Sequence, residues 1–462
     1  MQTTFDPWRS GVAAVAVSMS AGASPAFLQA QQERRLRELL RAAEQGSAHH
    51  RRVFKGFDLE RVRLNELPVS HKAELMHDFA SWVTDPALQL DELRRFIAQP
   101  ANIARAFLGR YTVWESSGST GEPAVFIQDA SAMGVYDALE AFRRPVLRPL
   151  QSWLDPWGLG ERLAFVGATG GHFASTVSVE RLRQLQPGLS HRLRGLSFLQ
   201  PMDALCGELD EFQPTSLATY PSAAVLLAEA QRAGRLHLRL REVWTGGESL
   251  SATARAFVGR TFGCPVSQSY GASEFLSLAF ECRHGTLHLN SDWAILEPVD
   301  ARGRAVPLGH PGTTTLLTNL ANHVQPLIRY DLGDRVTLLP TPCACGSHLP
   351  AIEVWGRDDD TLVLTRGRGK GVVKVVPLAV STVLEEAGLF DFQLVQRTAT
   401  ELLLNTGLQG EAAQPALAAA SAQLQAFLHQ QGARGVHIRC SSDTPAICGR
   451  SGKIQRVIAC GA

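Results

Sequence analysis

The loop at residues 116–123 has the composition of a site that could hold phosphate groups. It reads Ser-Ser-Gly-Ser-Thr-Gly-Glu-Pro. Glycines let the backbone approach an anion closely, and hydroxyl groups can donate hydrogen bonds to phosphate oxygens. The loop lacks the Gly-Lys-Ser/Thr ending of a Walker A motif. Taken alone, the same residues are equally typical of a hairpin turn rich in serine and glycine.

Two further segments combine a ring, hydroxyls and carboxylates. Residues 269–274 read Ser-Tyr-Gly-Ala-Ser-Glu. They offer an aromatic ring that can stack on a purine, hydroxyls for a phosphate and a carboxylate that can hold Mg²⁺. The alternative for this segment is a turn followed by a helix that Ser273 caps. Residues 328–334 end in Gly-Asp, where Asp334 could accept from two ribose hydroxyls or be a simple turn residue.

The fourth segment lies close to the C-terminus, at residues 451–457. It contains Lys453, whose ammonium group could place a positive charge beside a reacting carboxylate and a phosphate. A lysine near a chain end is normally a solvated surface residue, so this segment has little weight when it is taken alone. The four segments gain weight when their order and spacing are considered together.

The elements that must position these segments follow from the hydrophobic pattern. β-like runs alternate with helical patterns, which is typical of an α/β fold. Strands are expected at residues 111–114, 124–127, 163–166, 240–245 and 313–317, and helices at residues 222–233 and 251–258. The first hundred residues are expected to be mostly helix and polar turn, with one helix beginning at Ser24-Pro25.

The composition changes near Gly356. Beyond it, the pattern predicts strands at residues 361–364, 392–396, 401–404 and 436–440, with helices at residues 377–387 and 415–429. These elements are sufficient for a small domain of about a hundred residues. The chain is therefore expected to have a large α/β N-terminal domain at residues 1–356 and a small α+β C-terminal domain at residues 357–462.

Charge and hydropathy limit the partners. The formal net charge is +1, which gives no overall field to attract nucleic acid or an anionic membrane. No apolar run reaches the roughly 18 residues that span a bilayer. Residues 11–30 resemble a signal peptide only poorly, because Asp6 precedes a short, broken apolar run. We therefore expect a cytoplasmic protein without nucleic-acid or membrane partners, and its oligomeric state stays open, a dimer being one option.

In order and spacing, the four segments resemble those of the adenylate-forming superfamily, which includes acyl-CoA synthetases, adenylation domains and luciferases. Within it, the chain looks most similar to the phenylacetate–CoA ligase family, from about Leu67 to the C-terminus. The resemblance implies an AMP-binding N-terminal domain and a mobile C-terminal domain that turns at a hinge, Asp359. The chain departs from the family pattern at Glu122, where lysine is usual, and at residues 331–334, which read Asp-Leu-Gly-Asp instead of Arg-Thr-x-Asp.

The resemblance also implies roles for individual residues. Lys453 would bridge the carboxylate and the α-phosphate, Glu274 would hold Mg²⁺, and Thr120 would hold the β- and γ-phosphates of ATP. The residues that would bind the nucleotide are Ser116, Ser117, Gly118, Ser119, Thr120, Gly121, Gly247, Glu248, Ser269, Tyr270, Gly271, Ala272, Ser273, Asp334 and Arg357. The residues near the acyl group would be His172, Tyr220, Pro221, Ser222 and Gly246.

Three conspicuous side chains have simpler interpretations. His172 follows two glycines and could border the acyl pocket, although a lone histidine is more often structural. Trp114 and Trp244 flank motif loops. We interpret both tryptophans as core residues.

The implied reaction is ATP-dependent activation of a carboxylic acid to an acyl-adenylate, followed by thioester formation with coenzyme A. An aromatic acid is the first expectation, and only the family name supplies it. One alternative within the same chemistry is transfer to the phosphopantetheine of an acyl or peptidyl carrier protein, or to an amine. Alternatives of other classes are a non-catalytic nucleotide- or zinc-binding protein and a zinc-dependent hydrolase, which would need an open metal position and a general base.

A structural zinc site is predicted from one imidazole and three thiols, namely Cys282, His288, Cys343 and Cys345. Without a secretory signal, clustered cysteines indicate metal binding rather than disulfides. Three thiolates and one imidazole suit tetrahedral Zn²⁺ and leave no position open for a substrate. Members of the phenylacetate–CoA ligase-like branch are similar here. His284 and His348 are alternative ligands, and scattered free cysteines are the alternative to a site.

Overall fold

The computed structural model describes residues 4–116, 123–144, 160–167, 169–198, 200–357, 361–366, 371–375, 377–408, 413–442 and 456–459. The helices are α1 (Pro7–Ser20), α2 (Pro25–Gly46), α3 (Ala48–Val53), α4 (Lys72–His77), α5 (Phe79–Trp82), α6 (Leu90–Ile97), α7 (Ala130–Arg143), α9 (Ala174–Leu185), α10 (Met202–Phe212), α11 (Pro221–Arg232), α12 (Ala252–Phe262), α13 (Pro377–Glu386) and α14 (Ala413–Gln430). Short helical turns occupy Leu64–Glu66, Pro100–Asn102 and Pro187–Arg192.

The strands are β1 (Thr112–Glu115), β2 (Val125–Gln128), β3 (Leu163–Gly167), β4 (Leu193–Ser197), β5 (Ser216–Thr219), β6 (Glu242–Gly246), β7 (Val266–Ala272), β8 (Phe275–Glu281), β9 (Leu287–Leu289), β10 (Ala294–Val299), β11 (Thr314–Asn319), β12 (Tyr330–Asp331), β13 (Asp334–Leu338), β14 (Ala351–Arg357), β15 (Leu362–Thr365), β16 (Val372–Val375), β17 (Gln393–Thr398), β18 (Glu401–Asn405), β19 (His437–Ser441) and β20 (Val457–Ile458).

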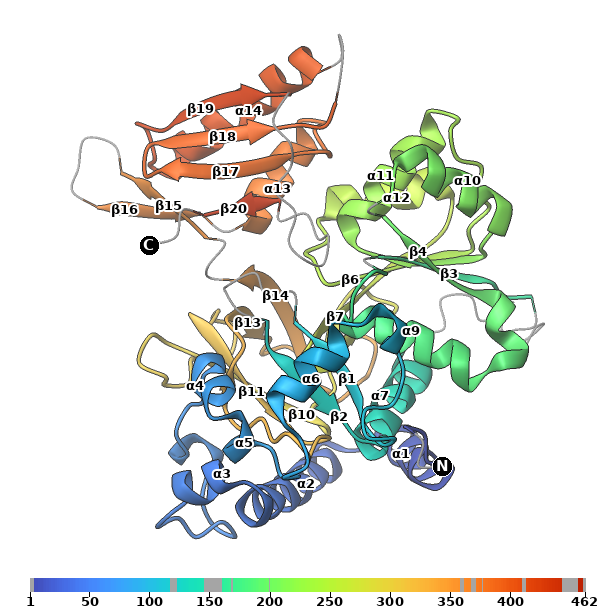
Figure 1. Ribbon diagram of the computed structural model, residues 1–462. Helices are drawn as coiled ribbons and strands as arrows, with labels where there is room; N and C mark the ends of the chain where they lie inside the picture. Colours follow the sequence, from blue (N-terminus) through green and yellow to red (C-terminus); the bar gives the residue numbers. More distant parts are fainter. Residues whose placement is uncertain are drawn as a thin grey trace.

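A nine-stranded sheet with the order β13-β14-β9-β8-β7-β6-β5-β3-β4 organises the larger part of the chain (Figure 1). The strands from β4 to β7 are parallel, and the strands from β8 to β13 continue the sheet in antiparallel fashion. Side chains of β6 alternate between the faces: Val243 packs into the core beneath α10, α11 and α12, whereas Trp244 contacts Arg144 at the end of α7. Helices therefore cover both faces of the parallel half, as parallel strands require.

The N-terminal helices pack against a smaller sheet of β10, β11 and β12. α2 begins as expected, because Pro25 occupies its first turn and the Ser24 hydroxyl accepts from the Phe27 backbone N–H at 3.3 Å. Its apolar face, which includes Leu39, packs against Ile328 in one core cluster. The helix expected after Ser24-Pro25 is therefore confirmed.

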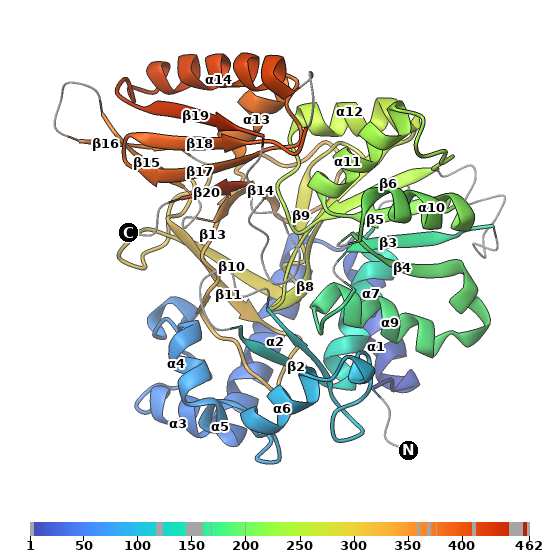
Figure 2. The ribbon, with the colours of Figure 1, turned by 45° about the horizontal axis from the view of Figure 1, so that its top comes forward.

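Residues from Leu362 onward form a separate hydrophobic core, and we call this part the C-terminal unit. It contains the β15–β16 hairpin and a four-stranded sheet of order β19-β18-β17-β20, against which α13 and α14 pack (Figure 2). This is the α+β architecture expected from the sequence. The boundary between residues 356 and 357 stays a prediction, because residues 358–360 lie outside the described residues.

The structure differs from the sequence analysis in the middle of the chain. α1 and the antiparallel strands β8, β9, β13 and β14 were not anticipated. Residues 269–274 do not lead into a helix capped by Ser273, because β7 turns directly into β8. Gly271 permits this tight hairpin, since a Cβ at that position would lie 1.9 Å from the carbonyl oxygen of Leu276.

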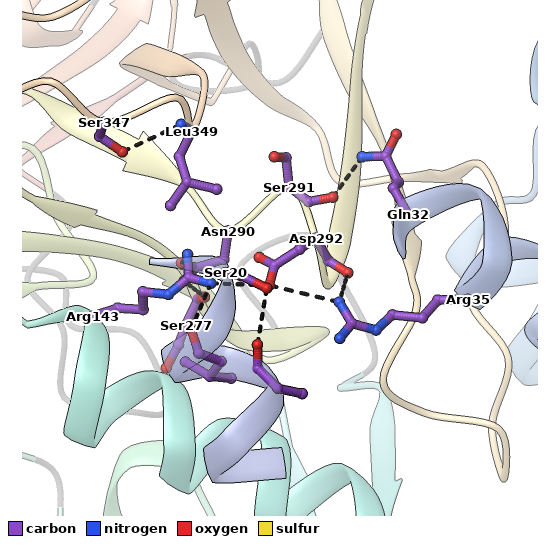
Figure 3. A network of polar contacts seen from close by, with 12 residues as sticks. Ser20, Gln32, Arg35, Arg143, Ser277, Asn290, Ser291, Asp292, Ser347 and Leu349 are labelled. Atoms are coloured by element: carbon purple, nitrogen blue, oxygen red, sulfur yellow. Dashed lines mark hydrogen bonds and ion pairs between the residues drawn. The ribbon is translucent and has the colours of Figure 1, made fainter. Parts of the chain in front are cut away.

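A buried ionic cluster joins α2 and α7 to the turn between β9 and β10 (Figure 3). Nη2 of Arg143 lies 2.9 Å from Oδ2 of Asp292, and Nη1 of Arg35 lies 3.6 Å from the same oxygen. All three side chains are almost completely buried. The Arg35 guanidinium also lies over the Trp293 ring, 3.4 Å from its centroid. Burial lowers the pKa of Arg35 to about 10, and the charge of Asp292 opposes this change.

We expect Asp292→Asn to lower the free energy of unfolding by about 3–5 kcal/mol, because two buried guanidinium groups lose their counter-charge. Urea unfolding measures this difference. Asp300→Asn is the matched control, since it breaks an exposed ion pair with Arg304 and should change stability little. If Asp292→Asn destabilised the chain no more than the control, the cluster would not hold the N-terminal helices to the sheet.

Candidate active site

A cavity of about 2180 Å³ opens at one edge of the nine-stranded sheet. It is larger than the roughly 300–1,000 Å³ of an ordinary ligand pocket, because it extends from the sheet to α13 and Arg456 of the C-terminal unit. Most of the expected nucleotide and substrate residues that the structure describes line it. They are Ser116, Tyr220, Gly246, Gly247, Glu248, Ser269, Tyr270, Gly271, Ala272, Ser273, Glu274 and Asp334.

Strand direction explains why these residues meet. β5, β6 and β7 are parallel, so their carboxyl ends lie at the same edge of the sheet. Tyr220 directly follows β5, Gly247 follows β6 and Ser273 follows β7. Ligands of α/β proteins bind in the crevice at this edge. Three segments that are far apart in the sequence therefore form one wall of the cavity.

Tyr270 and Asp334 are in direct contact. The Tyr270 hydroxyl donates to Oδ2 of Asp334 at 2.7 Å, although the two residues lie on β7 and β13, on either side of three other strands. Both residues line the cavity, and Tyr270 is nearly buried. The hydrogen bond fixes the direction of the ring, and a carboxylate oxygen can accept more than one hydrogen bond.

Two buried donors hold the turn that carries Glu274. Nε1 of Trp114 donates to the carbonyl oxygen of Ser273 at 2.8 Å, and Nδ2 of Asn319 donates to the carbonyl oxygen of Glu274 at 2.9 Å. Trp114 is fully buried, so its interpretation as a core residue is confirmed. The Glu274 side chain is itself nearly buried and lines the cavity. A carboxylate held in this way could hold a divalent cation.

Glu248 links two of the expected segments. Its Oε2 accepts from the backbone N–H of Ser222 at 3.1 Å, in the first turn of α11, where a negative charge is favoured. Burial raises the pKa of the neighbouring Tyr220 to about 12, and the charge of Glu248 acts in the same direction. Gly247 has φ +77°, a conformation that a side chain would disfavour.

The hairpin of β1 and β2 carries the start of the hydroxyl-rich loop to the cavity. The backbone N–H of Ser116 donates to the carbonyl oxygen of Ala124 at 2.8 Å, and the Ser116 hydroxyl accepts from the Ala124 N–H at 2.9 Å. The rest of that loop lies outside the described residues, as do two other expected site residues. These residues are Ser117, Gly118, Ser119, Thr120, Gly121, Asp359 and Lys453. For Arg357 only the backbone is described, and it pairs with Asp334.

Three expected substrate residues are not among the residues that line the cavity. His172 is buried, with its ring 5.9 Å from that of Phe96, and it is not among the residues that line the cavity. Burial lowers its pKa. Pro221 and Ser222, at the start of α11, are likewise absent from the lining. Phe173, the neighbour of His172, does reach the cavity.

The sequence analysis did not identify Trp244 as a cavity residue. Trp244 is buried, as its interpretation as a core residue predicts, and it also lines the cavity; the Arg144 guanidinium lies 4.6 Å from the centroid of its ring. Strand alternation could have predicted this position, because Trp244 is two residues from Gly246 and the two therefore face the same side of β6. Arg144 and its neighbour on α7, Glu140, carried no local motif that would have distinguished them.

The Cys/His cluster, which comprises Cys282, His288, Cys343 and Cys345, has the geometry of a metal site. Their ligand atoms all lie within 4.8 Å of one another. Sγ of Cys282 is 3.7 Å from Sγ of Cys343, and Sγ of Cys345 is 3.3 Å from Nε2 of His288. Ligands at the Zn–S and Zn–N distances usual for tetrahedral zinc would be separated by about 3.8 and 3.5 Å. The spacing therefore fits a zinc ion.

Hydrogen bonds around the cluster orient its ligands. The carbonyl oxygen of Leu349 lies 2.9 Å from Nδ1 of His288, so a proton on Nδ1 leaves Nε2 free to bind metal. The backbone N–H groups of His284 and Ser347 donate to the sulfurs of Cys282 and Cys345, each at 3.4 Å. Such donors stabilise thiolates. His284 therefore supports the cluster through its backbone.

The C-terminal unit contacts α11 and α12 beside the cavity. The Glu385 carboxylate accepts from the Ser251 hydroxyl and pairs with Arg456. Phe257 of α12 and Phe390 stack at an angle of 19°, with their centroids 4.6 Å apart. Because Arg456 also lines the cavity, this contact fixes the C-terminal unit relative to the site.

Two carboxylates lie in the same contact. Burial raises the pKa of Glu229 to about 7, and the negative charge of Asp391 adds to this effect. Arg232, Arg235 and Arg456 oppose the change. Burial also raises the pKa of Asp391. The contact is therefore more favourable when at least one of the two carboxyl groups is protonated.

This arrangement predicts a pH dependence of stability. The folded-state pKa of Glu229 lies above its ordinary value of 4.5, so its contribution is fully present below about pH 4.5 and is lost as the pH rises through about 7. Between about pH 5 and pH 8, the wild type should lose up to roughly 3 kcal/mol more stability than Glu229→Gln. Thermal unfolding as a function of pH measures the difference. Glu211→Gln, at an exposed position, should follow the wild type, and equal slopes for all three proteins would contradict the raised pKa.

Comparison with known proteins shows which proteins the chain resembles. A family model described as AMP-binding enzyme matches residues 185–315, which include β6, β7 and the turn at Glu274. Protein CapK from Staphylococcus aureus is 24% identical over 210 residues. That alignment covers 44% of this chain and 44% of CapK, so the chain spans less than half of this curated relative.

Solved structures of a 2-hydroxyisobutyryl-CoA ligase share the fold over nearly the whole chain. In the post-adenylation state with R3-HIB-AMP, that protein gives a TM-score of 0.67 at 21% identity, covering 95% of this chain and 91% of the other. In the thioesterification state with 2-HIB-AMP and CoA, the TM-score is 0.55 at 22% identity, with the same coverage. At this level of identity the likeness shows the fold alone.

The half-parallel sheet joined to an α+β unit is the fold that this chain shares with the 2-hydroxyisobutyryl-CoA ligase structures. The family match over residues 185–315 and the shared fold make the chain similar to adenylate-forming proteins, in agreement with the resemblance seen in the sequence. The predicted fold class is thereby confirmed, whereas membership of the phenylacetate–CoA ligase family stays a prediction. In the part of the chain that the structure describes, no helix is long and apolar enough to cross a bilayer.

Proposed function

We propose that the chain uses ATP to convert a carboxylic acid to an acyl-adenylate and then transfers the acyl group to coenzyme A. The observation that carries this proposal is the convergence of Tyr270, Glu274 and Asp334 on one cavity, together with the Tyr270–Asp334 hydrogen bond of 2.7 Å. These residues suit a purine, a magnesium ion and a ribose, respectively. Phe165, Phe173 and Trp244 line the same cavity and support an aromatic acid as the substrate.

In the first half-reaction, a carboxylate oxygen attacks the α-phosphorus of ATP, and the bond from that phosphorus to the oxygen bridging the β-phosphate breaks. Pyrophosphate carries away the bonding electrons. In the second, a thiolate attacks the acyl carbonyl carbon, the acyl–AMP bond breaks and AMP leaves. Both steps depend mainly on positioning and on stabilising charge. Mg²⁺ would be held by Glu274 and would neutralise phosphate charge.

Lys453 is assigned the bridging charge between the carboxylate and the α-phosphate. Its own position lies outside the described residues, but Arg456, three residues later, lines the cavity. Arg456 pairs with Glu385 and donates to the carbonyl oxygen of Phe390 at 2.8 Å, and these contacts hold Arg456 against the rest of the C-terminal unit. Rotation of that unit about Asp359 between the half-reactions would withdraw Lys453 and admit the thiol.

The proposal is tested by pyrophosphate release from ATP and Mg²⁺ with a panel of aryl, arylacetic and aliphatic acids, with and without coenzyme A. Acid-dependent release, with thioester formed only when coenzyme A is present, is the expected result. Release without thioester would indicate a carrier protein or an amine as the acceptor. No release with any acid, from protein that still binds ATP, would favour a non-catalytic nucleotide-binding protein.

Lys453→Ala should reduce acid-dependent pyrophosphate release by at least about 100-fold, because the reacting carboxylate and α-phosphate would lose the positive charge assigned to Lys453. It should leave thioester formation from a supplied acyl-adenylate largely intact. Lys55→Ala, at an exposed position, is the control and should behave as the wild type in both assays. Equal loss of both half-reactions in Lys453→Ala would contradict the alternation of the C-terminal unit.

We also propose that the Cys/His cluster binds a structural zinc ion. All four ligands are accounted for, so the cluster offers no position for a substrate and instead ties the β8–β9 turn to the connection between β13 and β14. The pKa of Cys343 falls to about 6, because hydrogen bonds from the backbone of Cys345 and from neighbouring side chains outweigh the opposing effect of burial. Metal would deprotonate the remaining thiols.

Metal analysis of reduced, purified protein should find about one zinc per chain. Cys343→Ser should lose the metal and unfold at a lower temperature, because binding energy at a structural site contributes to folding. Cys440→Ser, which removes an exposed free cysteine, should retain both metal and stability. A wild-type protein with unoxidised cysteines and no stoichiometric zinc would refute the site.

A further inference from the structure

We propose that the acid activated by this chain carries a hydroxyl group remote from its carboxylate, and that Arg144 and Glu140 recognise that hydroxyl. This inference rests on the proposed function and names a substrate class for the same cavity. Neither residue belongs to the nucleotide-binding group described above. The proposal therefore concerns which acid is chosen, and not how the acid is activated.

Helix α7 places the two residues at the far end of the cavity. Tyr136 and Glu140 lie on α7 and Arg144 is its C-cap; at intervals of four they follow one face of the helix, with a rise of about 6 Å per step. All three line the cavity. Tyr136 marks the end near Glu274, because Nδ2 of Asn319 donates both to the Tyr136 hydroxyl, at 3.0 Å, and to the Glu274 carbonyl oxygen, at 2.9 Å. Glu140 and Arg144 lie successively farther from this end.

Strand β6, which faces α7 across the cavity, also runs away from the end near Glu274, from Gly246 to Trp244. Trp244 and Gly246 face the same side and are about 6.6 Å apart along the strand. An acid whose carboxylate lies at Gly246 would therefore extend across the indole of Trp244. A hydrogen bond of 2.9 Å from Nε1 to Glu242 fixes that indole, and the Arg144 guanidinium lies over it. The helix and the strand together separate the Arg144–Glu140 pair from Gly246 by about the length of one aromatic ring or a short aliphatic chain.

The pair can donate and accept hydrogen bonds at the same time. Nε of Arg144 lies 2.9 Å from Oε2 of Glu140, and the Ser277 hydroxyl donates to Oε1 of Glu140 at 2.9 Å. The two charged side chains remain 31% and 43% exposed, so both reach the open space of the cavity. The guanidinium has further N–H groups on its terminal nitrogens, and each carboxylate oxygen has a further lone pair.

Charge decides which ligand group fits. The Arg144–Glu140 pair has no net charge, and Asp137, one turn away on α7, is already paired with Arg181 at 3.0 Å. On the described part of α7, a second carboxylate on the acid would therefore meet no surplus positive charge and would lie beside Glu140. A hydrocarbon would displace water from both groups without replacing its hydrogen bonds. A hydroxyl can accept from Arg144 and donate to Glu140, which satisfies both.

Three acids with one skeleton test the proposal: phenylacetic acid, its para-hydroxy derivative and its para-carboxy derivative. Hexanoic acid, its terminal hydroxy derivative and the matching dicarboxylic acid provide an aliphatic series. The measurement is kcat/KM for pyrophosphate release. In at least one series, the wild type should favour the hydroxy acid over both relatives by about 10- to 100-fold, the range that one net hydrogen bond to a charged group supplies.

Two variants connect this preference to the pair. Arg144→Met should lower kcat/KM for the hydroxy acid by about 10- to 100-fold, so that its advantage over the parent acid disappears. Glu140→Gln retains the shape of the side chain but leaves Arg144 without a counter-charge, so it should shift the preference toward the dicarboxylic acid. Arg304→Met, which removes an exposed and ion-paired arginine elsewhere, should retain the wild-type preference.

The outcomes separate this inference from the proposed function. If the wild type released pyrophosphate equally well with the hydroxy and parent acids of both series, or preferred the dicarboxylic acids, the inference would be wrong and the ligase proposal would stand. Retention of the hydroxyl preference by Arg144→Met would also overturn it. Absence of release with every acid would refute the proposed function itself, and this inference with it.

Discussion

The pairing of β9 with β14 is the constraint on which the rest of the site depends. Ala351 lies opposite His288, and this register brings the two halves of the Cys/His cluster together. Because β14 also pairs with β13, the same register places Asp334 beside Tyr270. A slip of one residue would turn the side chains of these strands to the other face and would separate both groups. A metal bound by the cluster would link the β8–β9 turn to the β13–β14 connection and would oppose such a slip.

The cavity depends on both parts of the chain. Strands β5, β6 and β7 supply the wall where the nucleotide is proposed to bind, and the C-terminal unit adds α13 and Arg456. The contact between the parts combines a ring stack with carboxylates that burial disfavours in their charged form, notably Glu229. Such a contact can hold the C-terminal unit in one position and still break, so that the unit takes up another position. The proposed two-step chemistry requires this exchange.

The sequence was informative where local physics decides structure. The N-cap at Ser24 predicted α2, and alternation of strands and helices predicted the α/β class. The antiparallel half of the sheet was not predicted, because β8, β9, β13 and β14 are set by pairing between distant segments rather than by a local pattern. The Cys/His cluster is the exception, since the chemistry of its side chains made the long-range contact visible in the sequence.

The residues that could select the acid were hidden for a related reason. Trp244 is an ordinary apolar residue of a buried strand until its neighbour Gly246 is seen to line the cavity. Arg144 and Glu140 are an ordinary helical ion pair until α7 is seen to line the cavity. Motifs identify residues that act on the shared part of the substrates, the nucleotide. Residues that act on the variable part have no motif, so only their three-dimensional placement can identify them.

The central claim is that a carboxylate oxygen becomes bonded to the α-phosphorus of ATP. The most direct measurement uses an accepted acid labelled with ¹⁸O in its carboxyl group, together with ATP, Mg²⁺ and coenzyme A, and analyses the nucleotide product by mass spectrometry. The account predicts AMP that carries one ¹⁸O atom from the acid, released together with unlabelled pyrophosphate. Labelled inorganic phosphate with ADP, or AMP without the label, would contradict it.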